Sequence, residues 1–314
     1  MDLKKALLRA REKNLWLKIL WFKSLRIRKK MSEKKDLKSR IEKSFIKTHT
    51  YPFSIDHPIT YADKLNWLKL YYRNPLMPIA ADKYEVRNYL KELGYEYLLN
   101  EVLGVWETID DFDISSLPSK FVLKSTHGSG PNWITIVKDK TDINWKAQKR
   151  LMKEWLSNSI EWMGGEWHYG EMKPRIIAEK FIEEPGGGLT DYKIHCFNGK
   201  TAYILVCLGR AEGKLKFYCM SPDWKILKVN KTGIEAPKDL VIPKPSNMEE
   251  MIRIAEDLSK PFPVVRMDFY DINNKIIFGE FTFFTNGGFD NGLTYEGQKM
   301  MGKLITLPEP NHKK

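Results

Sequence analysis

Two pairs of alternating apolar runs, each joined by a short turn, restrict this chain to folds that contain antiparallel sheets. The pairs are residues 192–197 with 201–207, and residues 264–270 with 275–284. Asn198-Gly199 joins the first pair, and this dipeptide strongly favours a two-residue hairpin turn. We therefore predict two β-hairpins in the second half of the chain.

Helical and strand periodicities alternate irregularly along the rest of the chain. Helices are expected at 1–50, 61–72, 82–93, 145–162 and 248–258, and further strands at 121–124, 133–138, 175–182, 215–220 and 226–229. Asn74, Pro75 and Pro78 are expected to interrupt helical structure. No glycine-punctuated βαβ pattern precedes residue 120, so no Rossmann-like lobe is expected there. Antiparallel hairpins mixed with helices indicate an α+β fold.

The positive charge of the chain is confined to its first fifty residues. The whole chain carries a net charge of +12, and residues 1–50 hold 17 basic against 5 acidic residues, so the remainder is neutral. Three interpretations are open: a solvated helix packed on the body, a nucleic-acid-binding arm, or an arm attracted to an anionic membrane or acidic glycan. The neutral body offers no continuous basic footprint, so nucleic acid is not an expected partner. We expect the arm to dock the protein at an anionic surface without taking part in chemistry.

Composition points to a cytoplasmic protein. Cys196, Cys207 and Cys219 match no zinc spacing, and an odd number of cysteines fits no disulfide framework, so we expect buried or half-buried thiols in a reducing compartment. No apolar run of 18 residues and no secretory signal are present, so the protein is expected to be soluble or peripheral at the inner membrane face.

A short glycine loop between two predicted strands could bind phosphate. Gly128, Ser129 and Gly130 would let backbone N–H groups turn inward around phosphate oxygens. The alternative is an ordinary hairpin turn, because strand-like rather than helical residues follow the loop. His127 could donate a hydrogen bond to the same phosphate, or simply pack within the structure.

The last predicted hairpin places two carboxylates together. Alternation puts Arg266 and Asp268 on one face of the first strand. On the second strand, the residues expected to share one face are Ile276, Phe278, Glu280 and Thr282. Asp268 and Glu280 should lie within a residue or two of register, and such a pair needs a cation, a shared proton or a neighbouring Arg. Both a magnesium site and a salt-bridge cluster with Arg266 satisfy this requirement.

Further polar residues lie in and beside the first hairpin. Asp191, Lys193 and His195 alternate along one strand and should face the same cleft. Arg210 follows the partner strand, where it could clamp a phosphoryl group or form a surface ion pair. Glu179 lies near the end of the apolar strand at 175–182, whose edge could pair with an adenine.

Taken in order, these elements resemble the ATP-grasp superfamily. From about residue 60 the chain more narrowly resembles the TupA-like ATP-grasp proteins of polysaccharide and teichuronopeptide biosynthesis. The segments that carry the resemblance are KLNWLKLYYRNPL, DKYEVRNYL, FVLKSTHGSG, PRIIAEKFIE, DYKIHCFNGK, RMDFYD and GEFTFF.

The resemblance implies a role for each matching residue. Lys83 and Lys124 would contact ATP phosphates, together with the loop at 127–130. The adenine would lie over the hinge strand, where the matching residues are Glu179, Lys180, Phe181 and Ile182. Asp191 and Lys193 would face the nucleotide. The magnesium hairpin would comprise Arg266, Asp268, Glu280 and Thr282.

The sequence departs from the superfamily pattern at two points. Thr282 stands where an Asn usually follows the metal-binding Glu, and Asn286 is the candidate to substitute for that Asn. A basic helical arm replaces the Rossmann-like lobe that usually helps to hold a substrate, so no acceptor site carries over. The implied organisation is an arm at 1–59, a first lobe at 60–182 and a C-terminal lobe at 183–314.

The implied activity is an ATP-dependent carboxylate–amine ligation through an acylphosphate. ATP and Mg²⁺ are the expected cofactors, with two ions and with Mn²⁺ as an alternative. The expected partners are a small-molecule or polysaccharide acceptor with a carboxylate, such as a uronic acid, and an amine donor such as an amino acid. The catalytic cations would be Arg266, Arg210 and Lys193. Two alternatives are a kinase that phosphorylates a sugar or amino acid, and a glycosyltransferase-like protein, for which Asp111 and Asp113 form the sole Asp-x-Asp motif.

Overall fold

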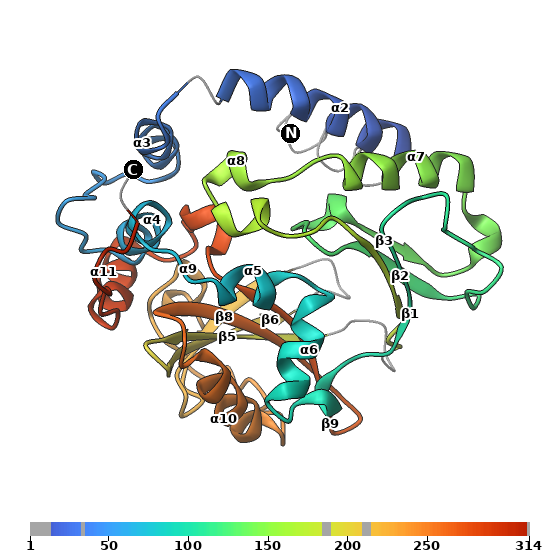
Figure 1. Cartoon of the computed structure of the whole chain (residues 1–314). Coiled ribbons are helices and arrows are strands. Elements are labelled where there is room, and N and C mark those ends of the chain that lie inside the picture. The colour runs from blue at the N-terminus through green and yellow to red at the C-terminus, as the bar shows by residue number, and fades with distance from the viewer. Residues whose placement is uncertain (1–13, 33–34, 184–189, 209–214, 313–314) are drawn as a thin grey trace. The chain divides into compact units, whose positions relative to one another are not determined.

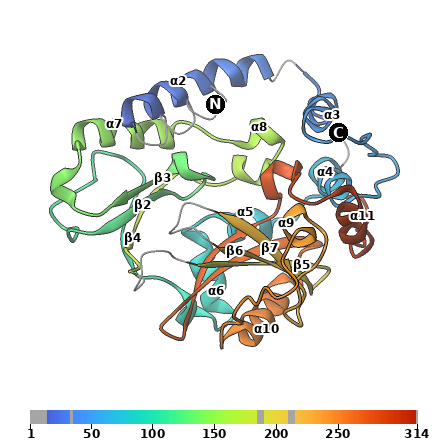
Figure 2. The same ribbon diagram turned by 180° about the vertical axis from the view of Figure 1, so that it is seen from behind.

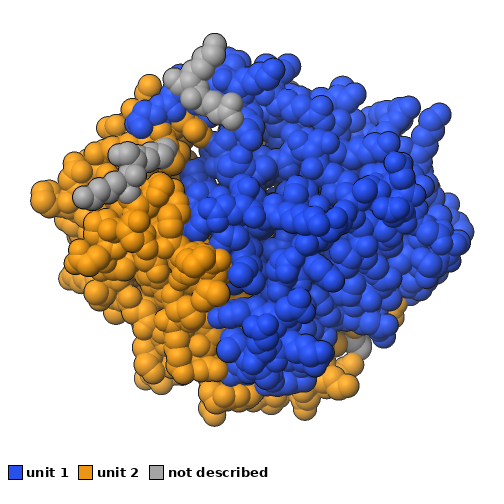
Figure 3. Space-filling model, viewed as in Figure 1, with its two compact units in different colours: residues 1–36, 78–182 blue, residues 37–77, 183–314 orange. Residues whose placement is uncertain are grey.

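The computed structural model describes residues 14–32, 35–183, 190–208 and 215–312. The chain forms two compact units, which are coloured separately in Figure 3. Unit 1 comprises residues 1–36 and 78–182, and unit 2 comprises residues 37–77 and 183–314. Each unit combines helices with an antiparallel sheet, so the predicted α+β class is confirmed.

Unit 1 is built on a four-stranded antiparallel sheet in the order β1-β4-β2-β3. Its strands are β1 (Val102–Trp106), β2 (Phe121–Ser125), β3 (Ile134–Val137) and β4 (Ile176–Lys180). The last three lie where strands were expected, whereas β1 was not predicted. This strand is short, its residues are all half-buried, and Gly104 lies where its pairing with β4 shifts register. A glycine that interrupts five residues weakens the strand pattern in sequence.

Five helices are described in or at the edge of unit 1: α2 (Leu15–Ser32), α5 (Leu76–Ala81), α6 (Glu85–Glu92), α7 (Trp145–Leu156) and α8 (Glu161–Gly164). The helix expected at 145–162 is divided, because Ser157 ends α7. The interruption expected near Pro78 is instead helical: α5 tolerates this proline in its first turn, where backbone N–H groups have no intrahelical acceptor.

Unit 2 contains a five-stranded antiparallel sheet in the order β7-β6-β5-β8-β9. Its strands are β5 (Asp191–Phe197), β6 (Lys200–Leu208), β7 (Lys216–Met220), β8 (Val264–Ile272) and β9 (Lys275–Thr282). The strand expected at 226–229 is reduced to one bridge, between Ile226 and Met220. Helix α10 (Met248–Ser259) packs against β5, β6 and β8 and covers one face of the sheet (Figures 1 and 2).

Both predicted hairpins are confirmed. Asn198 and Gly199 have φ of 49° and 79°, as a type I′ turn requires, and Asn273 and Asn274 have φ of 51° and 60° at the second turn.

One strand face was predicted wrongly. A bulge at Gly279 lets Asp268 pair with Glu280 while Phe269 pairs with Phe278. The Phe278 ring therefore lies 5.2 Å from that of Phe281, on the face opposite Glu280, because the extra residue reverses the alternation.

The remaining helices of unit 2 are α3 (Leu37–Thr48), α4 (Tyr61–Tyr71), α9 (Lys231–Ile234) and α11 (Tyr295–Lys303). The single long helix expected over residues 1–50 is thus two helices in the described part of the chain, and each joins a different unit. In α2, Ile19, Phe22 and Leu25 are buried, and the helix packs on α7. In α3, Ile41 and Phe45 are buried. The basic segment therefore contributes buried side chains to both units, as expected of helices packed on the body. Docking of this segment at an anionic surface stays a prediction.

None of the helices in the described ranges is long and apolar enough to cross a membrane. The three cysteines are free and buried, as expected.

Candidate functional site

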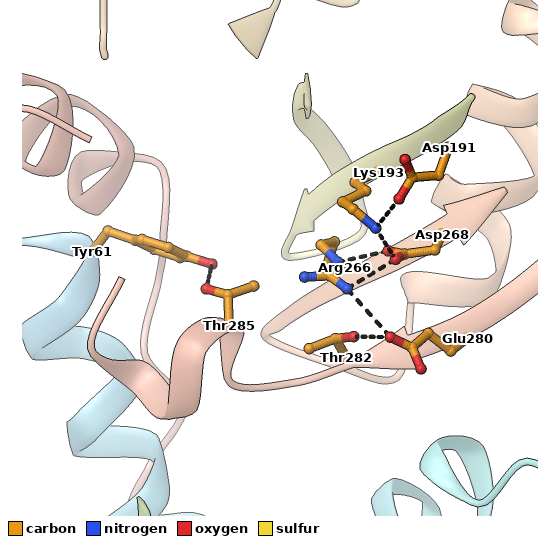
Figure 4. A network of polar contacts seen from close by, with 8 residues as sticks. All are labelled: Tyr61, Asp191, Lys193, Arg266, Asp268, Glu280, Thr282 and Thr285. Carbon is orange, nitrogen blue, oxygen red and sulfur yellow. Dashed lines mark hydrogen bonds and ion pairs between the residues drawn. The ribbon is translucent and has the colours of Figure 1, made fainter. Parts of the chain in front are cut away.

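The predicted metal hairpin lies on the face of the unit 2 sheet opposite α10. Three strands carry its polar side chains, because Lys193 of β5 pairs with Asp268 of β8, which pairs with Glu280 of β9. Figure 4 shows these side chains pointing toward one another. The expected proximity of Asp268 and Glu280 is confirmed, and they lie directly opposite each other.

An unbroken chain of ion pairs links the three strands (Figure 4). The Lys193 ammonium contacts Asp268 and lies 2.5 Å from Asp191 Oδ2. The Arg266 guanidinium donates from Nε to Asp268 Oδ1 at 2.6 Å and from Nη2 to Oδ2 at 2.9 Å. Arg266 Nη2 also lies 3.4 Å from Glu280 Oε1, to which Thr282 donates a hydrogen bond at 3.4 Å. Three carboxylates thus face two cations.

Electrostatics keeps this network charged. Burial acts to raise the pKa of Asp268, but Arg266 and Lys193 outweigh it and hold the pKa below its usual value. Burial likewise acts to lower the pKa of Lys193, whereas Asp268 raises it, and the pKa is raised overall. Asp268 is therefore ionised and Lys193 protonated at neutral pH.

The donor set fits a hard divalent cation. Asp268 and Glu280 offer carboxylate oxygens on one face, the network retains one excess negative charge, and the Glu280 side chain is 37% exposed. Mg²⁺ commonly takes one or two carboxylates and completes its shell with phosphates and water. No cluster of three or more His, Cys, Asp or Glu suited to a metal occurs among the described residues. The two alternatives from the sequence, a magnesium site and a salt-bridge cluster, would use the same residues.

A neutral imidazole lies beside the network. His195 pairs with Arg266 across the β5–β8 ladder, and its ring stacks on Tyr203 with centroids 4.0 Å apart. Burial and the Arg266 charge hold its pKa well below the usual value. Neither ring nitrogen has a hydrogen-bond partner within the described part of the chain.

The turn after β9 makes buried polar contacts with α4 that sequence analysis did not predict. Lys69 of α4 is fully buried, donates to Gly287 O at 2.5 Å and lies 4.3 Å from the Phe289 ring centroid. Tyr61 and Thr285 are hydrogen-bonded through their hydroxyls at 3.2 Å. Asn286, proposed as a substitute ligand, is exposed in this turn and has a φ of 49°. In the sequence, Asn286-Gly287-Gly288 indicates a turn with residues of positive φ at this position.

Unit 1 brings together the residues predicted to contact nucleotide phosphates. Lys83 Nζ donates to Gly128 O at 2.7 Å, at the start of the glycine loop. Lys124 of β2 forms a 2.5 Å ion pair with Glu179 of the neighbouring strand β4. Lys83 thus contacts the segment that follows β2, and Lys124 links β2 to β4.

The glycine loop has a structural role as well. A Cβ on Gly128 would lie 2.3 Å from Trp133 Cδ2, so the backbone approaches this ring too closely for any other residue. Ser129 and Gly130 are exposed, whereas His127 is fully buried.

The ring of His127 is already surrounded by protein partners. Its Nδ1 lies 2.9 Å from Ser125 Oγ, and its Nε2 lies 3.0 Å from Trp155 O and 3.1 Å from Asn158 O. A phosphate contact from His127 would therefore require the ring to move.

The hinge after β4 is partly satisfied by the protein. The Lys180 backbone N–H donates to Glu101 O at 3.0 Å, and its carbonyl accepts from Asn100 Nδ2 at 2.9 Å. Backbone contacts to an adenine would therefore come from the next residues, Phe181 and Ile182, which are half-buried. Arg210 lies outside the described residues.

The Asp-x-Asp motif is accounted for by turn structure. Asp111 accepts a hydrogen bond from Thr108 at 2.8 Å, and Asp113 accepts from the Ser115 backbone at 2.8 Å and from its hydroxyl at 2.6 Å. Side-chain-to-backbone bonds of this kind are typical of Asx turns. Both carboxylates are exposed.

Comparison with known proteins identifies one family. A family model described as TupA-like ATPgrasp matches residues 63–306. A search of curated proteins returned no match.

Several solved structures resemble the chain at low identity. The D-alanine–D-alanine ligase of Bacillus anthracis is 14% identical, with 72% of this chain and 63% of the ligase aligned and a TM-score of 0.42. The corresponding ligase of Helicobacter pylori is 16% identical over 74% of this chain and 59% of the ligase, with a TM-score of 0.41. A RimK domain ATP-grasp protein of Sphaerobacter thermophilus is 10% identical over 78% and 69%, with a TM-score of 0.39. The chain thus spans less than two thirds of the length of the two ligases.

Proposed function

Because the chain belongs to the TupA-like ATPgrasp family and has the ATP-grasp fold, we propose that it is an ATP-dependent ligase that activates a carboxylate and joins it to an amine. One structural observation carries this proposal. Asp268 and Glu280 lie directly opposite each other on a sheet face, with two cations bound to Asp268. Oxygen donors beside fixed positive charges are what transfer of a phosphoryl group demands.

The residues of unit 2 are assigned to the reacting phosphoryl group. Asp268 and Glu280, with the Thr282 hydroxyl, would hold Mg²⁺, or Mn²⁺ as the alternative. Bound there, one or two ions would polarise the phosphates. Lys193 and Arg266 would neutralise charge on the transferring group, and Arg210 is proposed as a third cation.

The residues of unit 1 are assigned to the rest of the nucleotide. Lys83 and Lys124 would bind phosphates, together with the exposed N–H groups of the loop at Ser129 and Gly130. The contacts of Lys83 with Gly128 O and of Lys124 with Glu179 support this assignment, because both lysines contact residues that are also assigned to the nucleotide. Phe181 and Ile182 would present backbone groups to the adenine.

The proposed reaction has two steps. A carboxylate oxygen of the acceptor attacks the γ-phosphorus of ATP, and the bond to ADP breaks, which yields an acylphosphate and ADP. The amine nitrogen then attacks the acyl carbon, inorganic phosphate leaves, and the amine loses a proton. The family resemblance favours a uronic acid or a polysaccharide uronate as the carboxylate, and an amino acid as the amine, in the synthesis of a cell-surface polysaccharide.

The test is to incubate the protein with ATP, magnesium and a panel of uronic acids, with and without amino acids. We expect ADP, phosphate and an amide. When hydroxylamine replaces the amine, it should trap the acylphosphate as a hydroxamate. ADP with a stable phosphorylated acceptor and no hydroxamate would instead identify a kinase. The absence of ADP formation with every acceptor would reject both activities.

A further inference from the structure

Helix α2 carries apolar side chains on two different sides. Ile19, Phe22 and Leu25 are buried within unit 1. A second set is exposed and follows helical spacing; we call it the outer stripe: Trp16 (48% exposed), Leu20 (62%), Ile27 (66%) and Met31 (66%). Figures 1 and 2 both show α2 lying across α7 at the edge of unit 1. Burial in the core therefore accounts for only one of the two apolar sides.

The outer stripe is set among positive charges. Helix α2 contains six Lys and Arg residues and no Asp or Glu. Arg26 and Lys29 form ion pairs at 2.9 and 2.8 Å with Glu154 and Glu161 of unit 1. The exposed basic residues that flank the stripe are Lys23, Arg28 and Lys30.

A basic cavity adjoins the same helix. Its volume is about 310 Å³, and its lining consists of Ile109, Asp110, Lys149, Arg150 and Lys153. Three cations against one carboxylate make it suited to an anion. The Arg150 guanidinium lies 5.4 Å from the Trp16 ring, so the cavity borders the N-terminal end of the outer stripe.

We propose that the outer stripe and the basic cavity together bind the surface of an anionic lipid bilayer. Helix α2 would lie in the plane of the interface, with its outer stripe at the acyl boundary and its basic flanks among anionic headgroups. Lys149, Arg150 and Lys153 would receive a headgroup phosphate or carboxylate. A membrane fits better than a polysaccharide or nucleic acid, because the free energy of exposed Leu, Ile and Met side chains falls when they pass from water into an apolar medium. This inference does not depend on the proposed ligase activity.

The electrostatic part is tested by sedimentation of the full chain with phosphatidylcholine vesicles, with or without about a third phosphatidylserine. We expect binding only to the anionic vesicles, weakened by salt. The variant K149Q/R150Q/K153Q should lower the partition coefficient by about tenfold or more. The matched control K225Q/K228Q/K238Q removes the same charge from exposed positions of unit 2 and should bind nearly as well as the wild type.

The apolar part is tested with a second pair of variants. L20Q/I27Q should lower the partition coefficient for anionic vesicles about tenfold. Salt should abolish the residual binding, because only the electrostatic attraction remains. V241Q/L304Q alters two exposed apolar residues of unit 2, at 82% and 54% exposure, and should have no such effect.

Three results would overturn the proposal. The wild type could fail to bind anionic vesicles at low salt, the control variants could lose as much as the test variants, or the protein could bind soluble polygalacturonate but not vesicles. Circular dichroism confirms that each variant is folded.

Discussion

The two opposed carboxylates of β8 and β9 occupy different environments. The Asp268 side chain is 6% exposed and contacts both Arg266 and Lys193, whereas Glu280 is 37% exposed and meets Arg266 only at 3.4 Å. Neutralising Asp268 would leave two largely buried cations without their main counterion. Neutralising Glu280 would leave the protein's own ion pairs mostly intact. Substitutions at these two residues can therefore separate stability from chemistry.

We expect Glu280→Gln to lower ATP turnover roughly a hundredfold or more, and to change the free energy of unfolding by less than about 1 kcal/mol. Asp268→Asn should also abolish turnover, but it should cost about 3–5 kcal/mol of stability, because a largely buried ion pair is broken on one side. Urea denaturation and ADP release measure the two effects. Wild-type turnover of Glu280→Gln at saturating magnesium would remove this residue from the site.

Two buried histidines link stability to pH. Burial lowers the pKa of His195 and of His127. In the unfolded chain each ring binds a proton near pH 6.5, whereas in the folded chain burial disfavours the protonated ring. The unfolded state thus binds more protons as the pH falls, and stability is lost below about pH 6.5, by up to about 1.4 kcal/mol per pH unit for each ring.

His195→Phe should reduce this pH dependence, because Phe keeps the ring that stacks on Tyr203 and has no proton to bind. The exposed His57→Phe is the matched control and should leave the dependence unchanged. Denaturation midpoints between about pH 7.5 and 5.5 measure the effect above the range in which carboxylates titrate. Equal slopes for wild type and His195→Phe would show that His195 takes up a proton in the folded state.

At the scale of elements, local turn chemistry was predictable and departures from regular periodicity were not. Asn198-Gly199 fixed the first hairpin, because both residues tolerate positive φ. The pairing of Asp268 with Glu280 followed from the second hairpin. The face of Phe278 was predicted wrongly, because alternation in sequence does not reveal which residue a bulge adds. Contacts made by Lys69 depend on a turn more than 200 residues away, which no local pattern indicates.

Gly279 makes the bulge compatible with close strand packing. A Cβ at this position would lie 2.9 Å from Asp268 O, a backbone atom that cannot turn aside. We expect Gly279→Ala to cost about 1–3 kcal/mol of stability and to lower ATP turnover, since β8 and β9 would have to shift at Asp268. At Gly292 the nearest atom is the end of the Asp290 side chain, at 3.1 Å, so Gly292→Ala is a suitable control. Full stability and turnover in Gly279→Ala would show that the hairpin accepts a side chain at the bulge.

At the scale of the whole molecule, the charge distribution located the basic segment correctly but did not reveal that its helices have buried side chains. Seventeen basic residues in the first fifty indicated a surface arm. In the structure, each of the two helices in the described part of that segment buries apolar side chains: Phe22 is buried in unit 1 and Phe45 in unit 2. Scattered apolar residues among many lysines give a weak amphipathic signal, and only the partner surfaces show which of them are covered. The arm at 1–59 and the two lobes that follow remain a proposal for how the chain divides in function.

Helix α2 has both buried and exposed apolar side chains, so two substitutions in this one helix can be compared. Phe22 is fully buried, with its ring centroid 4.7 Å from that of Trp133, whereas Leu20 is 62% exposed. Phe22→Ala should therefore lower the free energy of unfolding by about 3–5 kcal/mol, because it leaves a cavity against unit 1. Leu20→Ala should change it by less than about 0.5 kcal/mol, since this side chain is already in water. Urea denaturation of both variants provides the measurement. If Phe22→Ala and Leu20→Ala were equally stable, α2 would not contribute to the stability of unit 1. The expected difference would mean that unit 1 requires the helix. Truncation of residues 1–45 would then damage the fold as well as any binding surface.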